Sequence, residues 1–350
     1  MELLRDLHAT ARAKLPPPVY DYFAGGAGDE RTLAENEAAW RDWWLVPRML
    51  TGVTAADPSV ELLGRRLSAP VLLAPVAAQR LLHPDGELAS ARAAAAAGTV
   101  FCLSTRATAD LAEVADAAPG APRWFQLYVG PDREAVAAML RRAAEHGYEQ
   151  IVLTVDLPVA GRRDREERHG PVAFPGGVSI TTHLPGTGDR TAAKPMVGGW
   201  QALTWEDVAW VREVSGLPVM VKGILSAEDA HVAVQAGVSA IVVSNHGGRQ
   251  LDGCLPTAVA LREVTAAVAG AVPVLVDGGI RDGGDVVRAL ACGAAAVLIG
   301  RPYVWGLACD GQAGVARVLD ALIADVARTL TLVGAATAAE VRPAHVRARG

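Results

Sequence analysis

The sequence predicts an α/β fold, a (β/α)8 TIM barrel with a helical N-terminal cap and a long loop after the fourth strand. Three observations predict this fold class. Short apolar runs recur eight times, Ala-rich helical patterns separate them, and small or polar residues end each run. Continuous apolar strands that alternate with helices indicate a parallel sheet covered by helices. Eight such units favour closure into a barrel, because closure removes exposed sheet edges.

The eight runs are the expected strands. They are APVLLAP (69–75), TVFCLS (99–104), RWFQLYV (123–129), IVLTVD (151–156), LPVMVKG (217–223), AIVVSNHGG (240–248), VPVLVDGG (272–279) and AAVLIGR (295–301). The intervening helical patterns, such as SAEDAHVAVQAG, start at Ser or Asp and stop at Gly, as capped helices do. An open doubly wound sheet is the alternative, but no G-x-G-x-x-G turn follows the first run.

Two segments fall outside the repeat. Residues 1–68 form the expected N-terminal cap, which ends in the turn-rich stretch TGVTAADPSV. Residues 161–200 are rich in Gly and Pro and carry two His and several Arg, which predicts a mobile lid loop over the barrel mouth. We expect residues 1–350 to form one domain with these embellishments.

Composition excludes several classes of protein. Apolar residues make up 51% of the chain, and the formal net charge of -5 gives no basic face for nucleic acid. The four cysteines lie far apart without a C-x-x-C pair, which favours reduced thiols over disulfides or a metal site. The longest apolar stretch is roughly half of the ~20 residues that a membrane span needs. A cytoplasmic protein without a membrane segment is expected.

Polar residues stand at the ends of the expected strands, where barrels of this type build their active sites. Such groups cost free energy in an apolar barrel unless a ligand or another polar group satisfies them. A set drawn from all eight strands therefore indicates a bound polar, planar ligand. The candidates are Gln79, Ser104, Gln126, Tyr128, Thr154, Asp156, Lys222, Ser244, His246, Arg249, Asp277, Arg281, Gly300 and Arg301.

The last two strands precede the glycine-rich turns VDGGIRDGGD and IGRP. Backbone N–H groups freed by glycine and backed by a helix N-terminus suit a phosphate dianion. Arg281 and Arg301 add positive charge there. The pattern fits FMN and a phosphorylated sugar substrate equally.

The segment SNHGGRQLDG (244–253) is more specific, because it places an imidazole and a guanidinium three residues apart beside two glycines. His246 is suited to accept a proton, and Arg249 to hold a carboxylate through a bidentate contact. Asp156, on a nearby strand, is placed to orient the imidazole ring. The pattern predicts acid–base chemistry on a carboxylate.

The chain resembles the FMN-dependent 2-hydroxy acid oxidase and dehydrogenase family, which includes glycolate oxidase, lactate oxidase, hydroxymandelate oxidase and mandelate dehydrogenase. The matching segments run in order over nearly the whole chain. They are VYDYFAGGAGDERTLAEN, APVAAQRLLHPDGE, FQLYV, LTVDLPVAGRR, VKGI, SNHGGRQLDG, VDGGIRDGGDV and IGRP.

The resemblance implies oxidation of a small L-2-hydroxy acid to the 2-oxo acid, with FMN as cofactor. His246 would be the base, oriented by Asp156, with Lys222 and Tyr128 also in the catalytic set. The substrate would be bound by Tyr22, Tyr128, Arg163 and Arg249. FMN would be bound by Ala77, Ser104, Gln126, Thr154, Lys222, Ser244, Asp277, Gly279, Arg281, Gly300 and Arg301.

Within this resemblance, Arg106 departs from the family, because glycolate oxidase-like members carry Trp near the substrate side chain at that position. Arg106 would bind a second anionic or polar group of the substrate if it points inward. If it points outward, it would pair with Asp110 or Glu113.

Three points have more than one interpretation: the electron acceptor, the proton that His246 removes, and the class of reaction. Reduced flavin would pass its electrons to O2, giving H2O2, or to a soluble acceptor. His246 would remove either the hydroxyl proton or the α-proton. An FMN isomerase barrel, a flavin-free sugar-phosphate barrel and a non-catalytic FMN-binding barrel are competing functions. Relatives imply a homo-oligomer, either a tetramer or an octamer.

Overall fold

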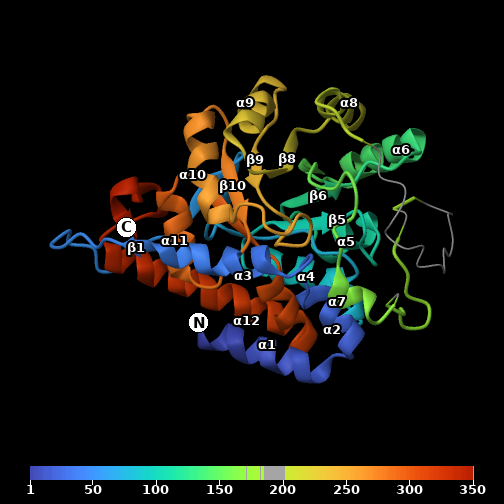
Figure 1. The fold of residues 1–350 in the computed structure, drawn as a ribbon, viewed down its shortest axis with the longest axis horizontal. Helices are drawn as coiled ribbons and strands as arrows, with labels where there is room; N and C mark the ends of the chain where they lie inside the picture. The colour runs from blue at the N-terminus through green and yellow to red at the C-terminus, as the bar shows by residue number, and fades with distance from the viewer. Residues whose placement is uncertain (171, 182, 185–201, 350) are drawn as a thin grey trace.

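The computed structural model describes residues 1–170, 172–181, 183–184 and 202–349. Eight parallel strands close into a barrel in the order β10-β11-β4-β5-β6-β7-β8-β9, which confirms the predicted (β/α)8 fold (Figure 1). Each of the eight predicted runs overlaps a barrel strand, and six of them contain it whole. The barrel strands are β4 (Val71–Leu73), β5 (Phe101–Ser104), β6 (Arg123–Leu127), β7 (Gln150–Thr154), β8 (Val219–Ile224), β9 (Ile241–Val243), β10 (Val274–Asp277) and β11 (Ala296–Ile299).

A helix follows each barrel strand and covers the outside of the barrel. Four of these helices have an Asp or Ser N-cap whose side chain accepts a backbone N–H, as the sequence pattern predicted: α5, α6, α9 and α11. The eight helices are α4 (Gly86–Ala96), α5 (Leu111–Ala117), α6 (Arg133–Glu145), α8 (Glu206–Ser215), α9 (Ala227–Gln235), α10 (Thr257–Val268), α11 (Gly283–Ala291) and α12 (Arg301–Val333).

The barrel interior is layered because side chains of a strand alternate between its two faces. The lower interior layer is apolar and forms one buried cluster, with Cys102, Trp124, Val152, Met220, Val242 and Leu275 among its members. Two residues further along the same strands, the next layer is polar. It consists of Ser104, Gln126, Thr154, Lys222, Ser244 and Asp277, all buried. The strands therefore carry polar side chains to the C-terminal end of the barrel.

A hairpin closes the opposite end of the barrel. Strand β2 (Val60–Leu62) pairs antiparallel with β3 (Arg65–Leu67). Leu62 and Leu67 are almost fully buried and join the apolar cluster of the barrel interior. This hairpin lies in the segment that the sequence assigned to a helical cap. The segment is helical only as far as Asp42, and β1 (Trp43–Leu45) pairs with β12 (Val346–Ala348) near the C-terminus.

The N-terminal helices pack beside the barrel. They are α1 (Glu2–Lys14), α2 (Pro17–Ala24) and α3 (Arg31–Ala38), and α1 lies along α12 (Figure 1). Helix α3 contacts the loop after β9: the side-chain amides of Asn36 and Asn245 exchange two hydrogen bonds of 2.8 Å. Trp40 Nε1 also donates to the carbonyl oxygen of Gly278. The N-terminal segment thereby supports the loops after β9 and β10.

The long segment after β7 begins with the short helix α7 (Asp164–Glu167). Residues 171, 182 and 185–201 lie outside the described part, so nearly half of the predicted lid over 161–200 does too. Within the described residues, Thr181 N donates to Ala107 O and anchors the segment to the loop after β5. No described helix is long and apolar enough to cross a membrane.

Two glycines in the loop after β9 allow a test of how tightly the N-terminal segment packs on the site. Gly248 has φ +75°, and a Cβ there would lie 2.7 Å from Leu33 N. Gly253, in the same loop, has φ +80°, and no atom of the described part of the chain lies within 4 Å of a Cβ there. Either alanine costs about 1–2 kcal/mol for its left-handed backbone, and the contact with Leu33 adds about 1–3 kcal/mol.

Gly248→Ala should therefore lower the free energy of unfolding by more than Gly253→Ala, as measured by urea denaturation followed by circular dichroism. Equal losses of unfolding free energy in the two variants would show that α3 shifts to accommodate the added methyl group.

Candidate functional site

A cavity opens at the C-terminal end of the barrel strands. Its volume is ≈ 1040 Å³, counting the part open to solvent. Most of the residues that the sequence singled out line it, although they come from the whole length of the chain. Those lining it are Tyr22, Ala77, Ser104, Arg106, Tyr128, Thr154, Arg163, Lys222, His246, Arg249, Asp277, Gly279, Arg281, Gly300 and Arg301.

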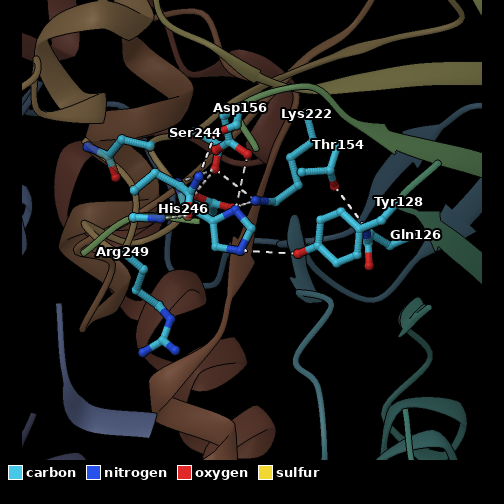
Figure 2. A network of polar contacts seen from close by, with 12 residues as sticks. Gln126, Tyr128, Thr154, Asp156, Lys222, Ser244, His246 and Arg249 are labelled. Atoms are coloured by element: carbon cyan, nitrogen blue, oxygen red, sulfur yellow. Dashed lines mark hydrogen bonds and ion pairs between the residues drawn. The ribbon is translucent and has the colours of Figure 1, made fainter. Parts of the chain in front are cut away.

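His246 lies between an acid and a phenol. Its Nδ1 is 3.1 Å from Asp156 Oδ1, and its Nε2 is 3.2 Å from the Tyr128 hydroxyl (Figure 2). The residue has φ +60°, and Gly247 and Gly248 also have positive φ. Three successive left-handed residues turn the chain sharply, so that the imidazole meets Asp156 at the end of β7.

The environment sets the charge of this pair. Burial lowers the pKa of His246 below its usual 6.5, although Asp156 opposes the shift. Burial alone would raise the pKa of Asp156, but the charge of His246 and the hydrogen bond from it hold that pKa below 3.8. A neutral imidazole whose Nδ1–H donates to an ionised Asp156 has its lone pair on Nε2. The lone pair therefore faces the cavity wall at Tyr128, where it is suited to accept a proton.

Lys222 supplies a buried positive charge beside this pair. Its Nζ donates to Ser244 Oγ at 2.8 Å and lies 3.0 Å from Asp277 Oδ2. Ser244 Oγ in turn donates to Asp277 Oδ1 and accepts from the backbone N of His246. Burial opposes the charge of Lys222, but Asp277 and Asp156 raise its pKa above 10.5. The ammonium is therefore charged at neutral pH.

A chain of neutral groups crosses the neighbouring strands β5, β6 and β7. Ser104 Oγ donates to Gln126 Oε1 at 3.1 Å, and Gln126 Nε2 donates to Thr154 Oγ1 at 2.9 Å. Figure 2 shows Gln126 and Thr154 on the Tyr128 side of the network, away from Arg249. Such a row of donors and acceptors fits the polar edge of a planar heterocycle.

Two arginines meet at the mouth of the cavity. Arg249 Nη1 donates to the carbonyl oxygens of Tyr22 and Gly25, and its guanidinium lies 5.5 Å from the centre of the Tyr22 ring. Arg163 is buried, and its Nε donates to Arg249 O at 3.4 Å. Burial and the charge of Arg249 lower the pKa of Arg163. Two close guanidinium groups of this kind suit a carboxylate.

Another part of the cavity wall has the features of an anion site. Gly279 and Arg281 follow β10, and Gly300 and Arg301 begin α12, whose N-terminus lines the cavity. Arg281 binds Glu37 at 2.7 Å. Arg301 donates to the carbonyl oxygens of Phe23, Gly25 and Gly247. Burial, with the charges of Arg249 and Arg281, lowers the pKa of Arg301 to about 9.

Some of the predicted residues lie behind the cavity wall or away from it. Gln126, Ser244 and Asp156 contact wall residues and do not line the cavity themselves. Gln79 is fully buried, and its side chain contacts Tyr303 and Ser90, so its role is structural.

Arg106 lines the cavity, and its charge acts on Tyr22. The acids considered for its outward orientation have other partners. Asp110 pairs with Arg142 at 2.6 Å, and Glu113 with Arg80 at 3.5 Å. The geometry favours the inward orientation.

Sequence reasoning missed several supporting residues. Glu166 lies 2.8 Å from Arg249 and 3.6 Å from Arg163. The spacing of Arg163 and Glu166, three residues apart at the start of a helix, was an available signal for their pairing. Asn36, Asn245 and Glu37 carried no local signal, because their partners lie more than 200 positions away.

The arrangement combines three chemical capacities: a proton acceptor with an orienting acid, a pair of arginines suited to a carboxylate, and a polar cavity wall that includes an anion site.

Comparisons with known proteins agree with this geometry. Residues 11–348 match the family model described as FMN-dependent dehydrogenase. Glycolate oxidase of Spinacia oleracea is 44% identical over 99% of this chain and 95% of its own. 4-hydroxymandelate oxidase of Amycolatopsis orientalis is 46% identical over 95% of this chain and 94% of its own. L-lactate oxidase of Nostoc sp. is 46% identical over 93% of this chain and 92% of its own.

Among solved structures, mandelate oxidase with benzoyl-formic acid has a TM-score of 0.89 at 44% identity and covers 98% of this chain and 97% of its own. Each of these comparisons covers nearly the full length of the chain. The chain therefore belongs to the FMN-dependent dehydrogenase family.

Proposed function

We propose that this protein is an FMN-dependent oxidase that converts a small L-2-hydroxy acid to the 2-oxo acid, with O2 as the electron acceptor and H2O2 as the second product. The observation that carries the proposal is the convergence of His246, Arg163 and Arg249 on one cavity, with Asp156 hydrogen-bonded to His246 behind its wall. A base and a carboxylate clamp in one site match the two functional groups of a 2-hydroxy acid. The oxidases of glycolate, 4-hydroxymandelate and L-lactate among the relatives support the reaction class.

The donor set of the cavity fits FMN. Lys222 uses two contacts within the described residues, to Ser244 and Asp277, and an ammonium has a third N–H to offer a ligand. Ser104, Gln126 and Thr154 present uncharged donors and acceptors, which suit the pyrimidine edge of the flavin ring. Among the described residues, only Val76 lies within 4 Å of a Cβ at Gly300, at 3.8 Å, so the backbone there is open to a ligand.

These observations support assigning different parts of the cavity to different parts of FMN. Ser104, Gln126, Thr154 and Lys222 would hold the flavin ring, with Ala77 and Ser244 in the same region. Asp277 would contact the ribityl chain. Gly279, Arg281, Gly300 and Arg301 would surround the phosphate at the N-terminus of α12. When bound, FMN supplies the two-electron acceptor of the reaction.

The substrate-side residues then have defined tasks. Arg249 and Arg163 bind the substrate carboxylate, and the Tyr22 hydroxyl donates a hydrogen bond to the substrate. The Tyr128 hydroxyl exchanges its contact with His246 Nε2 for a hydrogen bond to the substrate. His246 Nε2 accepts either the hydroxyl proton or the α-proton, and both routes leave an imidazolium. Asp156, which is ionised, stabilises that imidazolium through Nδ1–H and holds the ring in the tautomer that leaves Nε2 unprotonated beforehand.

The competing functions differ in what they require of the site. An FMN-dependent dehydrogenase with a soluble acceptor would use the same residues and differ only after the substrate has been oxidised. An isomerase barrel has no use for the pairing of His246 with two arginines. The oxidase names of the relatives favour O2.

Three further features complete the proposal. The thiols of Cys102, Cys254, Cys292 and Cys309 are free, which supports a reducing, cytoplasmic location. The exposed side chains of Trp44, Met49, Leu50 and Leu332 support association into a homo-oligomer. The single domain over residues 1–350 and the lid role of residues 161–200 stay predictions, because much of that segment lies outside the described residues.

The proposed function predicts reduction of the bound flavin by a 2-hydroxy acid. The FMN-loaded protein should be yellow, and one of glycolate, lactate, mandelate or malate should bleach it without oxygen. Air should then restore the colour and produce H2O2. His246→Ala should slow the bleaching by about 10²–10⁴, because the proton acceptor is lost, while the protein stays yellow.

The outcomes separate the competing functions. Bleaching that only an added soluble acceptor reverses would indicate a dehydrogenase. A protein that takes up FMN but is bleached by no 2-hydroxy acid would contradict the proposed reaction. A protein that cannot take up FMN would contradict the cofactor as well.

Arg106 predicts a preference among these acids. A guanidinium on the cavity wall stabilises a second carboxylate or a strongly polar side chain of the substrate. Arg106→Ala should therefore lower kcat/KM for malate by about tenfold or more relative to that for lactate, a loss of about 1.4 kcal/mol in transition-state binding. Arg92→Ala, on α4 and outside the cavity lining, is the control. An unchanged malate-to-lactate ratio would rule out contact between Arg106 and the substrate.

A further inference from the structure

Glu166 faces both arginines of the proposed carboxylate clamp. Its Oε1 lies 2.8 Å from Arg249 Nη2, in a hydrogen bond, and 3.6 Å from Arg163 Nη1. All three side chains are largely buried, with exposed fractions of 19% for Glu166, 15% for Arg249 and 9% for Arg163. Arg163 and Arg249 line the cavity, whereas Glu166 contacts them without being part of the cavity lining. One carboxylate thus serves as the counter-ion of two cations.

The two guanidinium groups remain in place for reasons besides Glu166. Arg249 Nη1 is held by the carbonyl oxygens of Tyr22 and Gly25, and Arg163 is tied to the backbone oxygen of Arg249. An amide at position 166 would keep an oxygen to accept the Arg249 N–H. The charge of Glu166 is therefore separable from the positions of the arginines.

Helix α7 is also anchored independently. Arg165 pairs with Glu30 and, at 3.8 Å, with Asp21, and His169 Nε2 lies 2.8 Å from Asp21. These contacts join α7 to α2 and to the residue before α3, and none of them involves Glu166. Removing the charge of Glu166 should therefore leave the helix attached.

The charge matters because the substrate and the product of the proposed reaction both carry the carboxylate that the arginines bind. An interaction that stabilises substrate, transition state and product equally does not accelerate chemistry, and it slows product release. Two desolvated guanidinium groups without a counter-ion would attract any carboxylate strongly. With Glu166 the net charge of the clamp is +1, from two cations and one anion, and a bound carboxylate brings it to zero.

We propose that Glu166 is a positioning residue whose negative charge, shared between Arg163 and Arg249, limits how tightly the clamp holds the carboxylate common to substrate and product. The inference rests on the proposed function. Glu166→Gln should raise the affinity for carboxylates by about tenfold, since a buried unit charge at this range acts strongly on the arginines even after solvent screening reduces its effect. KM for the 2-hydroxy acid should fall with it, while kcat stays the same or falls.

The experiment measures binding of 2-oxo acids, which cannot be oxidised by this reaction. FMN-loaded wild type and Glu166→Gln are titrated calorimetrically with glyoxylate, pyruvate and benzoylformate, and with the primary amide of each. The variant should bind the acids about tenfold more tightly and the uncharged amides within about twofold of wild type. A change in shape or packing would move acids and amides together, so the acid-to-amide ratio isolates charge.

Two controls accompany the variant. Glu167→Gln removes the same charge from the neighbouring, exposed position of α7 and should leave both affinities unchanged. Glu166→Asp keeps the charge and should retain the wild-type acid-to-amide ratio, even if Glu166→Gln folds poorly.

The inference would be overturned if Glu166→Gln bound the acids no more tightly than wild type. It would also be overturned if the affinities for acids and amides rose by the same factor. Both results would leave the proposed function intact. A wild type that binds none of the acids would contradict the carboxylate clamp itself, and the inference with it. A shift of the ratio in Glu166→Asp equal to that in Glu166→Gln would also overturn it, since the charge would then not be the cause.

Discussion

Burial of charge at the mouth of an apolar barrel is the constraint on which this site depends. The alternation of strand side chains sets a polar layer directly above a dry apolar layer, so each charge there must meet an opposite charge or a hydrogen-bond partner. The structure meets that requirement in pairs: Lys222 with Asp277, His246 with Asp156, and the two arginines of the clamp with Glu166. Lys222, His246 and both arginines line the cavity, so at least one member of each pair is placed to meet the ligand.

Backbone geometry joins these pairs. Ser244 accepts from Lys222 and from the backbone of His246, and it donates to Asp277, so one hydroxyl connects the cation to the base. The left-handed turn through His246, Gly247 and Gly248 is supported by the N-terminal segment, which packs on the loop through Leu33 and Asn36. The cap is therefore part of the site, although it lies outside the barrel repeat.

The repeating features were the ones that the sequence could reveal. Apolar runs and caps depend on neighbouring residues, so all eight strands and the polar residues at their ends could be predicted, and with them most of the cavity wall. Features made by contacts between distant segments could not. The β2–β3 hairpin has the sequence of a turn-rich linker, because Leu62 is buried only by contact with the apolar interior of the folded barrel. Glu166 looks like one more charge in a polar helix until Arg249, 83 positions later, lies against it.

The central claim is that His246 acts as a neutral base beside an ionised Asp156. The most direct test is the pH dependence of kcat/KM for the 2-hydroxy acid, since this quantity reports the protonation state of the free enzyme. Burial places the pKa of His246 below 6.5, so kcat/KM should be constant above about pH 7 and fall with acidification below that pKa. Asp156→Asn removes a charge that raises the His246 pKa, so its acid limb should move to lower pH and its plateau should drop. A wild-type kcat/KM that rises as the pH falls from 7 to 5 would contradict a neutral base at His246.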